Sequence, residues 1–499
     1  MPVLLGIDLG TSGVKVLAIT ADGKMLASVN VTYPLLQPRA GWSEQNADHW
    51  WRGVTEAIQK ILAHPDVTHD SVQALSISGQ MHGSVFLDND YRVIRNPILW
   101  NDTRTVEQCK YITAKIGEEQ LLNLVGNPAL DGFTLPKVLW LRDNEPENYQ
   151  KLKHLFLPKD YILYKLTGRI CTEMSDAAGT LLLDVKNRCW SEKLCDLLDI
   201  DKSILPEVLE SIDVVDKISK EAAENTGLSQ SIKVIAGGAD NACSAVGNGI
   251  VEEGIILASI GSSGVVLAHT DTMSHDPHGR IHSFNHSLPH RWYLMGVTLS
   301  AGMSMSWLKN EIIRKDYDYI NREAATIEAG SEGVIFLPYL FGERTPHRDP
   351  HARGVFFGLS GIHSQKHLMR SVFEGVSFAL KDSLELIKAL GVTPRQVRVT
   401  GGGGKSPLWR QILADVFETK VSAMQADEGP AYGAALLAGV GSGIFNTVQE
   451  ATAKTIKMGE TTNPDQENSD KYREIYPVFR SLYNSLKDDF KKSFKTNTE

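Results

Sequence analysis

An apolar run near the start of the chain is interrupted by Gly6-Ile7-Asp8-Leu9-Gly10-Thr11-Ser12-Gly13-Val14-Lys15, a segment rich in glycines and small hydroxyl residues. The same design returns in the second half as Ala258-Ser259-Ile260-Gly261-Ser262-Ser263-Gly264-Val265. Each pattern predicts a strand, a tight turn and a second strand. Backbone N–H groups and hydroxyls in such turns form a concave anion site, and glycine allows close backbone approach. Two such loops in two domains predict a clamp for the polyphosphate of ATP.

The first loop has a simpler interpretation. Taken alone it is explained equally well as an ordinary β-hairpin, since Asp, Gly, Thr and Ser are common turn residues. Its recurrence in the second half favours a phosphate site. Asp8 lies at the end of the predicted strand, where it can reach Mg²⁺ through water, because Mg²⁺ keeps several of its waters. Lys15 fits a phosphate partner and a solvated strand residue equally well.

The bulk composition indicates the class of protein. A chain of 499 residues exceeds a single core, so two or three domains are expected. The net charge of −9 and the lack of an extended basic block argue against a nucleic-acid partner. The five cysteines have neither metal spacing nor an even framework, which predicts reduced thiols in a cytoplasmic protein. The sequence shows no signal peptide and no apolar stretch of about 20 residues, so no membrane attachment is expected.

Hydrophobic periodicity outlines an α/β organisation. Strands are predicted at 4–7, 14–18, 27–33 and 72–78, with an amphipathic helix at 46–63 before the last of them. This order suits a mixed sheet with helices on its faces. Residues 105–224 are richer in helical patterns and are interpreted as an insertion that shapes a substrate site. The polar tail, residues 463–499, is interpreted as surface with one helical pattern.

A glycine run in the second half follows a predicted strand at 397–399 and precedes a predicted helix at 408–417. Its sequence, Gly401-Gly402-Gly403-Gly404-Lys405-Ser406, is not a P-loop, because Val399 stands where that motif needs its first glycine. Adenine or ribose could lie flat against such a backbone, with Ser406 as a polar contact. A flexible turn is the alternative, although four consecutive glycines carry a large entropic cost.

Asp240 and Asn241 follow a predicted strand at 234–237 and begin a predicted helix. Asp240 fits two roles equally well on spacing. It is a suitable helix N-cap. It also fits a general base that orients and deprotonates a hydroxyl during phosphoryl transfer.

Two short segments carry side chains suited to a polyol. Gln80-Met81-His82-Gly83 follows a strand, and a histidine ring can donate to or accept from hydroxyl groups. Trp100-Asn101-Asp102-Thr103-Arg104 combines indole, amide, carboxylate and guanidinium groups. The structural alternatives are a lone core histidine and a core tryptophan beside a surface Asp–Arg pair.

The chain resembles the FGGY carbohydrate kinases over nearly its whole length. Two long family patterns carry the resemblance, one at 132–144 (Gly-Phe-Thr-Leu-Pro-Lys-Val-Leu-Trp-Leu-Arg-Asp-Asn) and one spanning 354–374. The resemblance implies an α/β fold with two actin-like (ribonuclease H-like) ATPase domains, each built on a five-stranded mixed sheet, with the active site in the cleft between them. It implies a sugar-binding N-terminal domain with the first phosphate loop at 1–248 and a nucleotide-binding C-terminal domain at 249–499.

The resemblance also implies roles for individual residues. Asp240 is the catalytic base, and Asp8 supports activity through Mg²⁺. The residues implied in sugar contact are Met81, His82, Asp240, Asn241, Trp100 and Asp102. Those implied in ATP binding are Gly10, Thr11, Ser12, Lys15, Gly261, Ser262, Ser263, Gly302, Ser306, Gly402, Gly403 and Ser406. Ser262 stands where the family usually has Thr, and Ser406 where some members carry Asn.

The segments at 80–83, 100–104, 157–161, 175–180 and 238–242 most resemble the branch that phosphorylates D-xylulose to D-xylulose 5-phosphate in D-xylose breakdown. A sister kinase for L-ribulose, L-xylulose or gluconate is the nearest alternative. A remote alternative is an ATP-driven binding protein of the actin or chaperone kind. Relatives are often homodimers, so a homodimer is expected.

Overall fold

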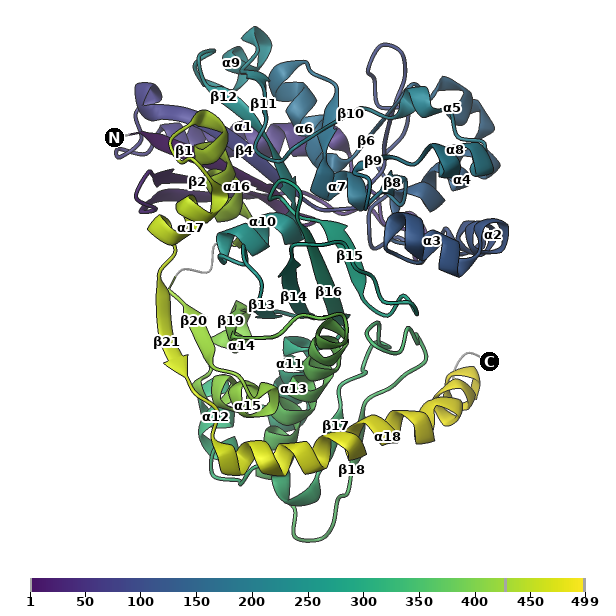
Figure 1. Ribbon diagram of the computed structural model, residues 1–499, viewed down its shortest axis with the longest axis vertical. Coiled ribbons are helices and arrows are strands. Elements are labelled where there is room, and N and C mark those ends of the chain that lie inside the picture. Colours follow the sequence, from purple (N-terminus) through teal and green to yellow (C-terminus); the bar gives the residue numbers. More distant parts are fainter. Residues whose placement is uncertain (1, 426–428, 497–499) are drawn as a thin grey trace.

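A computed structural model describes residues 2–425 and 429–496. Two large β-sheets dominate it, the first in the upper half of Figure 1 and the second below it. The four strands predicted in the first quarter of the chain are confirmed as β1 (Val3–Leu9), β2 (Gly13–Thr20), β3 (Met25–Thr32) and β4 (Val72–Gly79).

The first sheet has the strand order β11-β12-β4-β1-β2-β3. Its remaining strands are β11 (Val214–Lys217) and β12 (Lys233–Ala239). β1 pairs antiparallel with β2 and parallel with β4, and β4 pairs parallel with β12. The carboxyl ends of β1, β4 and β12 therefore meet at one edge. Asp8, Gln80 and Asp240 lie at or just beyond these three ends.

The second sheet has the order β15-β16-β14-β13-β19-β20-β21. Its strands are β13 (Ile255–Ile260), β14 (Gly264–Thr270), β15 (His282–Asn285), β16 (Trp292–Thr298), β19 (Gln396–Thr400), β20 (Val421–Met424) and β21 (Met458–Thr462). The order β16-β14-β13-β19-β20 repeats β3-β2-β1-β4-β12, with the same parallel pairings at its centre. The repeat of loop and strand order is thus a repeat of architecture.

The expectation of five strands in each sheet is wrong in its count. The first sheet has six strands and the second has seven. The additional strands are β11, β15 and β21. Each lies at the edge of its sheet, outside the repeated five, and pairs antiparallel with its neighbour. They lengthen each sheet without changing the strands that carry the predicted loops.

Some helices cover the faces of the two large sheets, and others pack mainly on one another. In the first half they are α1 (Ala47–Leu62), α2 (Val106–Ile116), α3 (Glu118–Val125), α4 (Thr134–Asn144), α5 (Pro146–Lys151), α6 (Pro158–Thr167), α7 (Met174–Ala178), α8 (Glu192–Leu198), α9 (Lys220–Thr226) and α10 (Asp240–Gly247). In the second half they are α11 (Gly302–Trp307), α12 (Tyr317–Ala324), α13 (Gln365–Ala389), α14 (Gly401–Gly404), α15 (Pro407–Phe417), α16 (Gly429–Ser442), α17 (Val448–Thr455) and α18 (Gln466–Thr496).

Local sequence explains α1 well. Asn46 caps it by accepting a bond from the Asp48 main-chain N–H at 2.8 Å, and the predicted apolar stripe is buried against the first sheet. The predicted helix-rich segment is also confirmed, since α2 to α8 fall within it, α9 begins in it, and most of these helices lie at the upper right of Figure 1. Four short two-stranded sheets accompany the helices: β5 (Val85–Leu87) with β6 (His154–Phe156), β7 (Cys171–Glu173) with β10 (Glu207–Leu209), β8 (Leu183–Asp184) with β9 (Cys189–Trp190), and β17 (Ile335–Leu337) with β18 (Val355–Phe357).

The two halves of the chain meet where α16 returns to the first sheet and packs against α10. Small residues make this approach close. A Cβ at Gly433 would lie 1.9 Å from the Cys243 carbonyl oxygen, and one at Gly6 would lie 1.9 Å from the Ala431 carbonyl oxygen. Residues 429–455 therefore share a core with β1 and β2. The division of the chain at 248/249 stays a prediction. The helix α16 belongs to the second half of the sequence and yet packs on the first sheet.

The interpretation of the tail as surface is wrong for α18, while residues 497–499 lie outside the described residues. Tyr472 and Phe479 of α18 are almost fully buried in the core under the second sheet. The Tyr472 hydroxyl accepts a bond from Arg370 at 2.9 Å and donates one to Glu374 at 2.8 Å, both on α13. The apolar residues of α18 are few and widely spaced in a polar sequence, because only one side of this helix contacts the core.

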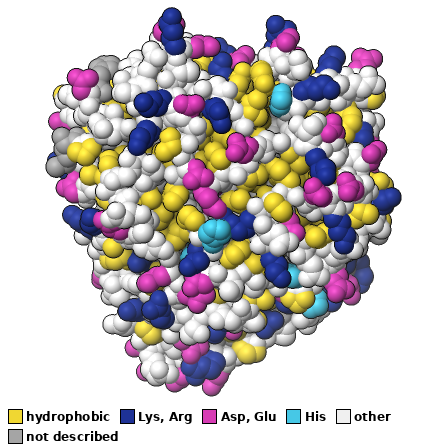
Figure 2. Space-filling view, turned by 45° about the horizontal axis from the view of Figure 1, so that its top comes forward, with side chains coloured by type: hydrophobic (Ala, Val, Ile, Leu, Met, Phe, Trp, Pro, Cys, Tyr) yellow, Lys and Arg dark blue, Asp and Glu magenta, His cyan; other side chains and the backbone are white. Residues whose placement is uncertain are grey.

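Charges of both signs are mixed on the face shown in Figure 2, where hydrophobic side chains gather toward the middle. Within the described residues, no helix combines the length and the apolar character needed to cross a bilayer.

Candidate active site

The first predicted loop is a β-hairpin turn between β1 and β2. The Gly10 N–H donates to the Gly13 carbonyl oxygen at 3.0 Å, and a Cβ at Gly13 would lie 2.6 Å from the Val31 carbonyl oxygen. Asp8 lies one residue before the end of β1 and accepts a bond from Ser78 Oγ at 3.0 Å. Burial raises the pKa of the Asp8 carboxyl, while Ser78 and the positive charge of Lys15 oppose that shift. Lys15 lies opposite Asp8 in the β1–β2 pairing.

Thr11 is held by a ring of side-chain amides. Its hydroxyl donates to Gln80 Oε1 at 3.1 Å, Gln80 Nε2 donates to Gln45 Oε1 at 3.2 Å, and Gln45 Nε2 donates to the Thr11 carbonyl oxygen at 2.6 Å. Trp100 Nε1 donates to the Thr11 hydroxyl at 2.9 Å. The structure therefore places Trp100 against the first loop, and the residue remains 42% exposed. Gln45 and Gln80 were not predicted as site residues, although Gln80 lies in a segment that the sequence singled out.

Asp240 is the first residue of α10, and Ala239 holds the N-cap position. The Asn241 main-chain N–H and Asn241 Nδ2 both donate to Asp240 Oδ1, at 2.7 and 2.9 Å. Burial, followed by the negative charge of Asp8, raises the pKa of Asp240 to about 7. A carboxyl that ionises near neutral pH, with one oxygen left unbonded by the described residues, suits proton transfer. The N-cap interpretation of Asp240 is not supported.

Met81 joins the two halves of the chain at this point. Its Sδ lies 3.7 Å from Asn241 Nδ2 and 3.9 Å from the hydroxyl of Tyr293 in β16. Phe284 of β15 and Phe133 belong to the same hydrophobic cluster. The predicted sugar residues Met81, His82, Asp240 and Asn241 are thus brought together, and Tyr293 is a neighbour that no sequence signal indicated.

His82 has a left-handed backbone with a φ of +68°, which is uncommon for a residue with a side chain. Its Nδ1 lies 2.6 Å from the Gly179 carbonyl oxygen, and its ring centroid lies 4.4 Å from that of Phe133. Burial, assisted by the positive charges of Lys137 and Arg344 and opposed by the Gly179 carbonyl, lowers the pKa of His82 to about 3. The imidazole is therefore neutral at physiological pH.

Gly179 follows α7, which is held by a buried ionic cluster. Lys159 Nζ lies 2.8 Å from Asp160 Oδ1 and 3.9 Å from both Glu173 Oε1 and Asp176 Oδ2. Glu173 also caps α7 by accepting bonds from the main-chain N–H groups of Ser175 and Asp176. All of them except Glu173 lie in segments that the sequence singled out, and together they fix the backbone that holds the His82 ring.

Asp102 is buried and belongs to a second ionic cluster. Its carboxylate accepts bonds from the Ser43 main-chain N–H at 2.6 Å and from Arg104, whose Nε and Nη2 approach at 2.8 and 2.6 Å. Its side chain has no exposed surface. The structure thus gives Asp102 a bidentate arginine partner, and its contact with a sugar stays a prediction.

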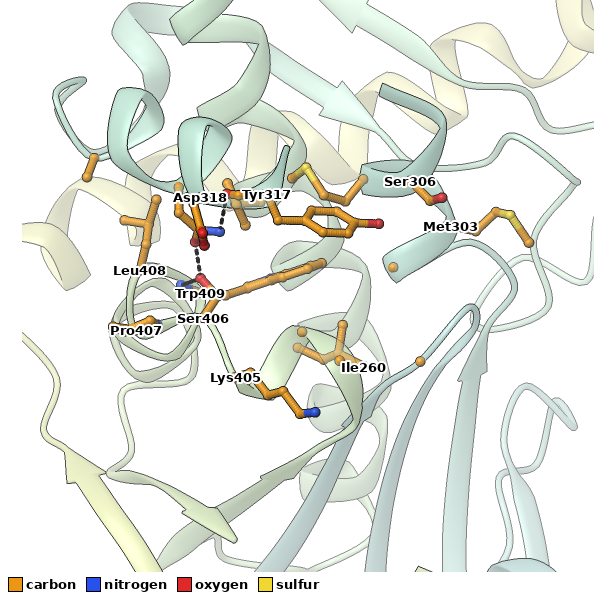
Figure 3. A pocket seen from close by; sticks show the side chains of 18 of the residues that line it. Ile260, Met303, Ser306, Tyr317, Asp318, Lys405, Ser406, Pro407, Leu408 and Trp409 are labelled. Carbon is orange, nitrogen blue, oxygen red and sulfur yellow. Dashed lines mark hydrogen bonds between the residues drawn. The ribbon is translucent and has the colours of Figure 1, made fainter. Parts of the chain in front are cut away.

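A cavity of about 940 Å³ lies among residues of the second half. Its walls come from the second predicted loop and from the segments around α11, α12, α14 and α15. In Figure 3, Tyr317 projects from α12, Ser306 and Met303 from α11, and Lys405 and Trp409 from the other side of the cavity. The lining includes most of the residues predicted to bind ATP in this half: Gly261, Ser262, Gly302, Ser306, Gly402, Gly403 and Ser406.

The backbones of three segments converge at this cavity. Gly302 N–H donates to the Gly261 carbonyl oxygen at 2.8 Å, and a Cβ at Gly401 would lie 2.6 Å from the Ile260 carbonyl oxygen. Gly401 also has a φ of +80°, so this position requires glycine. A Cβ at Gly402, by contrast, would meet no heavy atom within 4 Å. The glycine run is one turn of helix, with Gly402 facing open space.

Polar side chains on two sides of the cavity form local hydrogen bonds. Ser406 Oγ donates to Asn321 Oδ1 and caps α15 by accepting from the Trp409 main-chain N–H at 3.0 Å. Asn310 Nδ2 donates to Ser306 Oγ at 3.4 Å. Tyr317 and Asn321 were not predicted as site residues, because α12 carries none of the motifs that were recognised in the sequence.

The cavity lining excludes Gly10, Thr11, Ser12, Lys15 and Ser263. A clamp formed by both loops therefore stays a prediction. Among the described residues, no group of three or more His, Cys, Asp or Glu side chains forms a metal cage. Mg²⁺ needs only one or two carboxylates besides water and phosphate oxygens. The negative charges of Asp8 and Asp240 repel each other, so a bound Mg²⁺ between or beside these carboxylates would be favourable.

Comparison with known proteins covers both halves. The family model described as the FGGY family of carbohydrate kinases, N-terminal domain, matches residues 3–247, and the model of the C-terminal domain of that family matches residues 256–442. A curated relative named xylulose kinase, from Bacillus subtilis (strain 168), is 42% identical over 500 residues, covering 100% of each chain.

Solved structures share the complete fold. Ligand-bound xylulose kinase from Lactobacillus acidophilus has a TM-score of 0.93 and 27% identity, covering 99% of this chain and 100% of that one. Gluconate kinase from Lactobacillus acidophilus has a TM-score of 0.92 and 27% identity, covering 98% and 99%. Two kinases named for different substrates thus match this fold about equally well.

Proposed function

The chain belongs to the FGGY family of carbohydrate kinases, and we propose that it transfers the γ-phosphoryl group of ATP to a hydroxyl of D-xylulose, giving D-xylulose 5-phosphate. The curated relative from Bacillus subtilis, which is named xylulose kinase, supports this choice of sugar because it matches over the full length of both chains. The segments around Met81 and Asp240 that resemble this branch of the family support it independently.

One observation carries the proposed chemistry. Asn241 donates two hydrogen bonds to Asp240 Oδ1, beside Met81 and His82. This leaves Oδ2 to accept the proton of a sugar hydroxyl as it attacks the γ-phosphorus. Because phosphoryl transfer has a loose transition state, a well-placed carboxylate serves better than a strong base. The shift of the Asp240 pKa toward 7 keeps the carboxylate basic enough to take the proton.

The cavity of the second half is proposed to hold the nucleoside of ATP. Gly402 and Gly403 offer backbone to a flat base or ribose, and Tyr317 and Trp409 supply aromatic surface. Gly261, Ser262 and Gly302 line the cavity on the side of the second loop, where backbone N–H groups and hydroxyls suit phosphate oxygens. Thr11, Ser12 and Lys15 are proposed to meet the phosphates from the first loop when the halves close and exclude water.

Asp8 is proposed to hold Mg²⁺, directly or through water. When bound, the cation neutralises charge on the phosphates during transfer. Asp8 is suited to this role because it lies next to the end of a central strand and shares a local excess of negative charge with Asp240. A homodimer in the cytoplasm completes the proposal, and light scattering and cell fractionation test its two parts.

A coupled ADP-release assay tests the substrate. It compares D-xylulose, L-ribulose, L-xylulose, D-gluconate, glycerol and no acceptor, each with MgATP. We expect kcat/KM to favour D-xylulose by about 100-fold, which is about 2.7 kcal/mol of transition-state binding. A preference for another polyol would keep the mechanism and change the substrate. ADP release that no acceptor increases would contradict the proposal.

A further inference from the structure

The Phe133–Lys137 segment is the part of the long sequence pattern at 132–144 that the proposed reaction does not use. It begins α4, and Lys137 lies inside the protein with no exposed surface. A fully buried lysine is rare unless its amine has a specific partner. Its partners here are two main-chain carbonyl oxygens, those of His82 at 2.8 Å and Gly132 at 2.7 Å.

The segment makes three separate contacts with His82. Lys137 Nζ and Thr134 Oγ1 both donate to the His82 carbonyl oxygen, at 2.8 and 3.0 Å. The Phe133 ring centroid lies 4.4 Å from the imidazole centroid. Since His82 has a φ of +68°, its backbone needs such external support to keep this conformation. The two N–H bonds from Lys137 require only an amine, so either protonation state of the lysine supplies them.

The remaining contact determines how the ring can bind a ligand. A carbonyl oxygen can only accept, so the 2.6 Å contact between Nδ1 and the Gly179 oxygen places the proton on Nδ1. Because burial keeps this imidazole neutral, Nε2 carries a lone pair. No described residue bonds to Nε2. A lone pair in this position attracts a hydroxyl and repels a carboxylate or carbonyl oxygen.

We infer that Lys137 and Thr134 are positioning residues, which fix His82 so that its Nε2 accepts a hydrogen bond from a hydroxyl of the sugar. This inference rests on the proposed function and deepens it. It assigns the Phe133–Lys137 segment a role in sugar selection. It also identifies the ligand class at this position as a hydroxyl-bearing sugar rather than a sugar acid presenting its carboxylate there.

A double-mutant cycle tests the inference with Lys137→Met, His82→Ala and the double variant. KM and kcat are measured for the best acceptor and for ATP, and sugar affinity is measured separately by calorimetry. We expect Lys137→Met to raise the KM and Kd for the sugar by about ten-fold, with the KM for ATP changed by less than about two-fold. In the His82→Ala background the same substitution should have almost no further effect, because the residue it positions is gone.

Thr134→Val is the second variant, since it removes one bond to the His82 carbonyl and leaves the buried amine in place. We expect a smaller rise in sugar KM, about three-fold, again absent in the His82→Ala background. If Lys137→Met does not fold, the cycle with Thr134→Val provides the same comparison. Leu139→Ala is the matched control, because Leu139 is equally buried on α4. It should lower the Tm and leave the sugar KM unchanged.

Equal effects of Lys137→Met and Thr134→Val with and without His82 would overturn the inference, as would a parallel rise in the KM for ATP. Wild-type protein measured beside the variants separates this result from a failure of the proposed function. If no sugar stimulates the wild type, both proposals fail. If the wild type phosphorylates a sugar and the cycle is additive, only the positioning role fails.

Discussion

Asn241 bonds twice to one oxygen of Asp240, from its main-chain N–H at 2.7 Å and from Nδ2 at 2.9 Å. The two donors fix the carboxylate at the start of α10 and leave Oδ2 unbonded by any described residue. The same Asn241 amide lies 3.7 Å from Met81 Sδ. One short segment therefore orients the proposed base and places it against the proposed sugar site.

Asp240→Asn should abolish most of the phosphorylation while preserving the fold. The amide oxygen can still accept both bonds from Asn241, but it cannot take a proton. We expect kcat to fall by about two to four orders of magnitude in the ADP-release assay. Circular dichroism should show an unchanged fold. Asp196→Asn, on the exposed side of α8, is the control that should keep full activity. Near-normal turnover by Asp240→Asn would remove Asp240 from the role of base.

The rate should depend on pH through the same group. Burial and Asp8 raise the pKa of Asp240 to about 7, and only the ionised form can accept a proton. The logarithm of kcat/KM should therefore fall with a slope of one below about pH 7, or below a somewhat lower value when a bound cation stabilises the carboxylate. A rate that is constant down to about pH 4 would contradict this assignment.

The contribution of Asp240 to the stability of the fold should depend on pH in the opposite direction, being greatest at low pH. The folded protein binds the Asp240 proton more tightly than the unfolded chain, whose carboxyl has the ordinary pKa of 3.8 against about 7 when folded. Stability from this group is present below about pH 4 and is lost as the pH rises to about 7. Asp240→Asn avoids that loss. Its Tm relative to wild type, measured with EDTA present, should rise over this interval and then level off. A difference that is constant with pH would show that Asp240 is not destabilised by burial.

Gly402→Val should block nucleotide binding without unfolding the protein. A Cβ at Gly402 meets no atom within 4 Å and lies at the cavity, so the new side chain occupies the space proposed for ATP. We expect the KM for ATP to rise by about ten-fold or more, with the KM for the sugar changed much less. Gly361→Val is matched to it, because a Cβ there also meets nothing within 4 Å and the residue lies outside the cavity lining. An unchanged KM for ATP would place the nucleotide elsewhere.

Tyr472→Phe should weaken the attachment of α18. The hydroxyl links Arg370 and Glu374 in a buried position, and its removal leaves one donor and one acceptor with a lost partner. We expect the free energy of unfolding, from urea denaturation, to fall by about 1–3 kcal/mol. Tyr111→Phe, at a residue that is 45% exposed, should change it by less than about 0.5 kcal/mol. Equal stability of the two variants would mean that the tail contributes little.

The fold was predictable where the pattern was local. The turns at 10–13 and 261–263, the strands beside them and α1 all follow from residues close together in sequence. Asp240 was left between two roles, because an aspartate at the start of a helix has the same sequence signature in either case. The number of strands that the family resemblance implied was wrong. No sequence pattern corrected it, since the edge strands β11, β15 and β21 are short and carry no distinctive pattern.

By itself, the sequence determined the two loops, the strands beside them and the residue types available for phosphate and hydroxyl binding. These depend on short-range backbone preferences and on alternating burial, which neighbouring residues specify. Only the tertiary structure determined that Met81 meets both Asn241 and Tyr293, that Gly179 selects the His82 tautomer, and that α12 lines the cavity proposed for ATP. Such contacts join residues far apart in the chain, so they depend on how the whole core packs, and no local pattern encodes them.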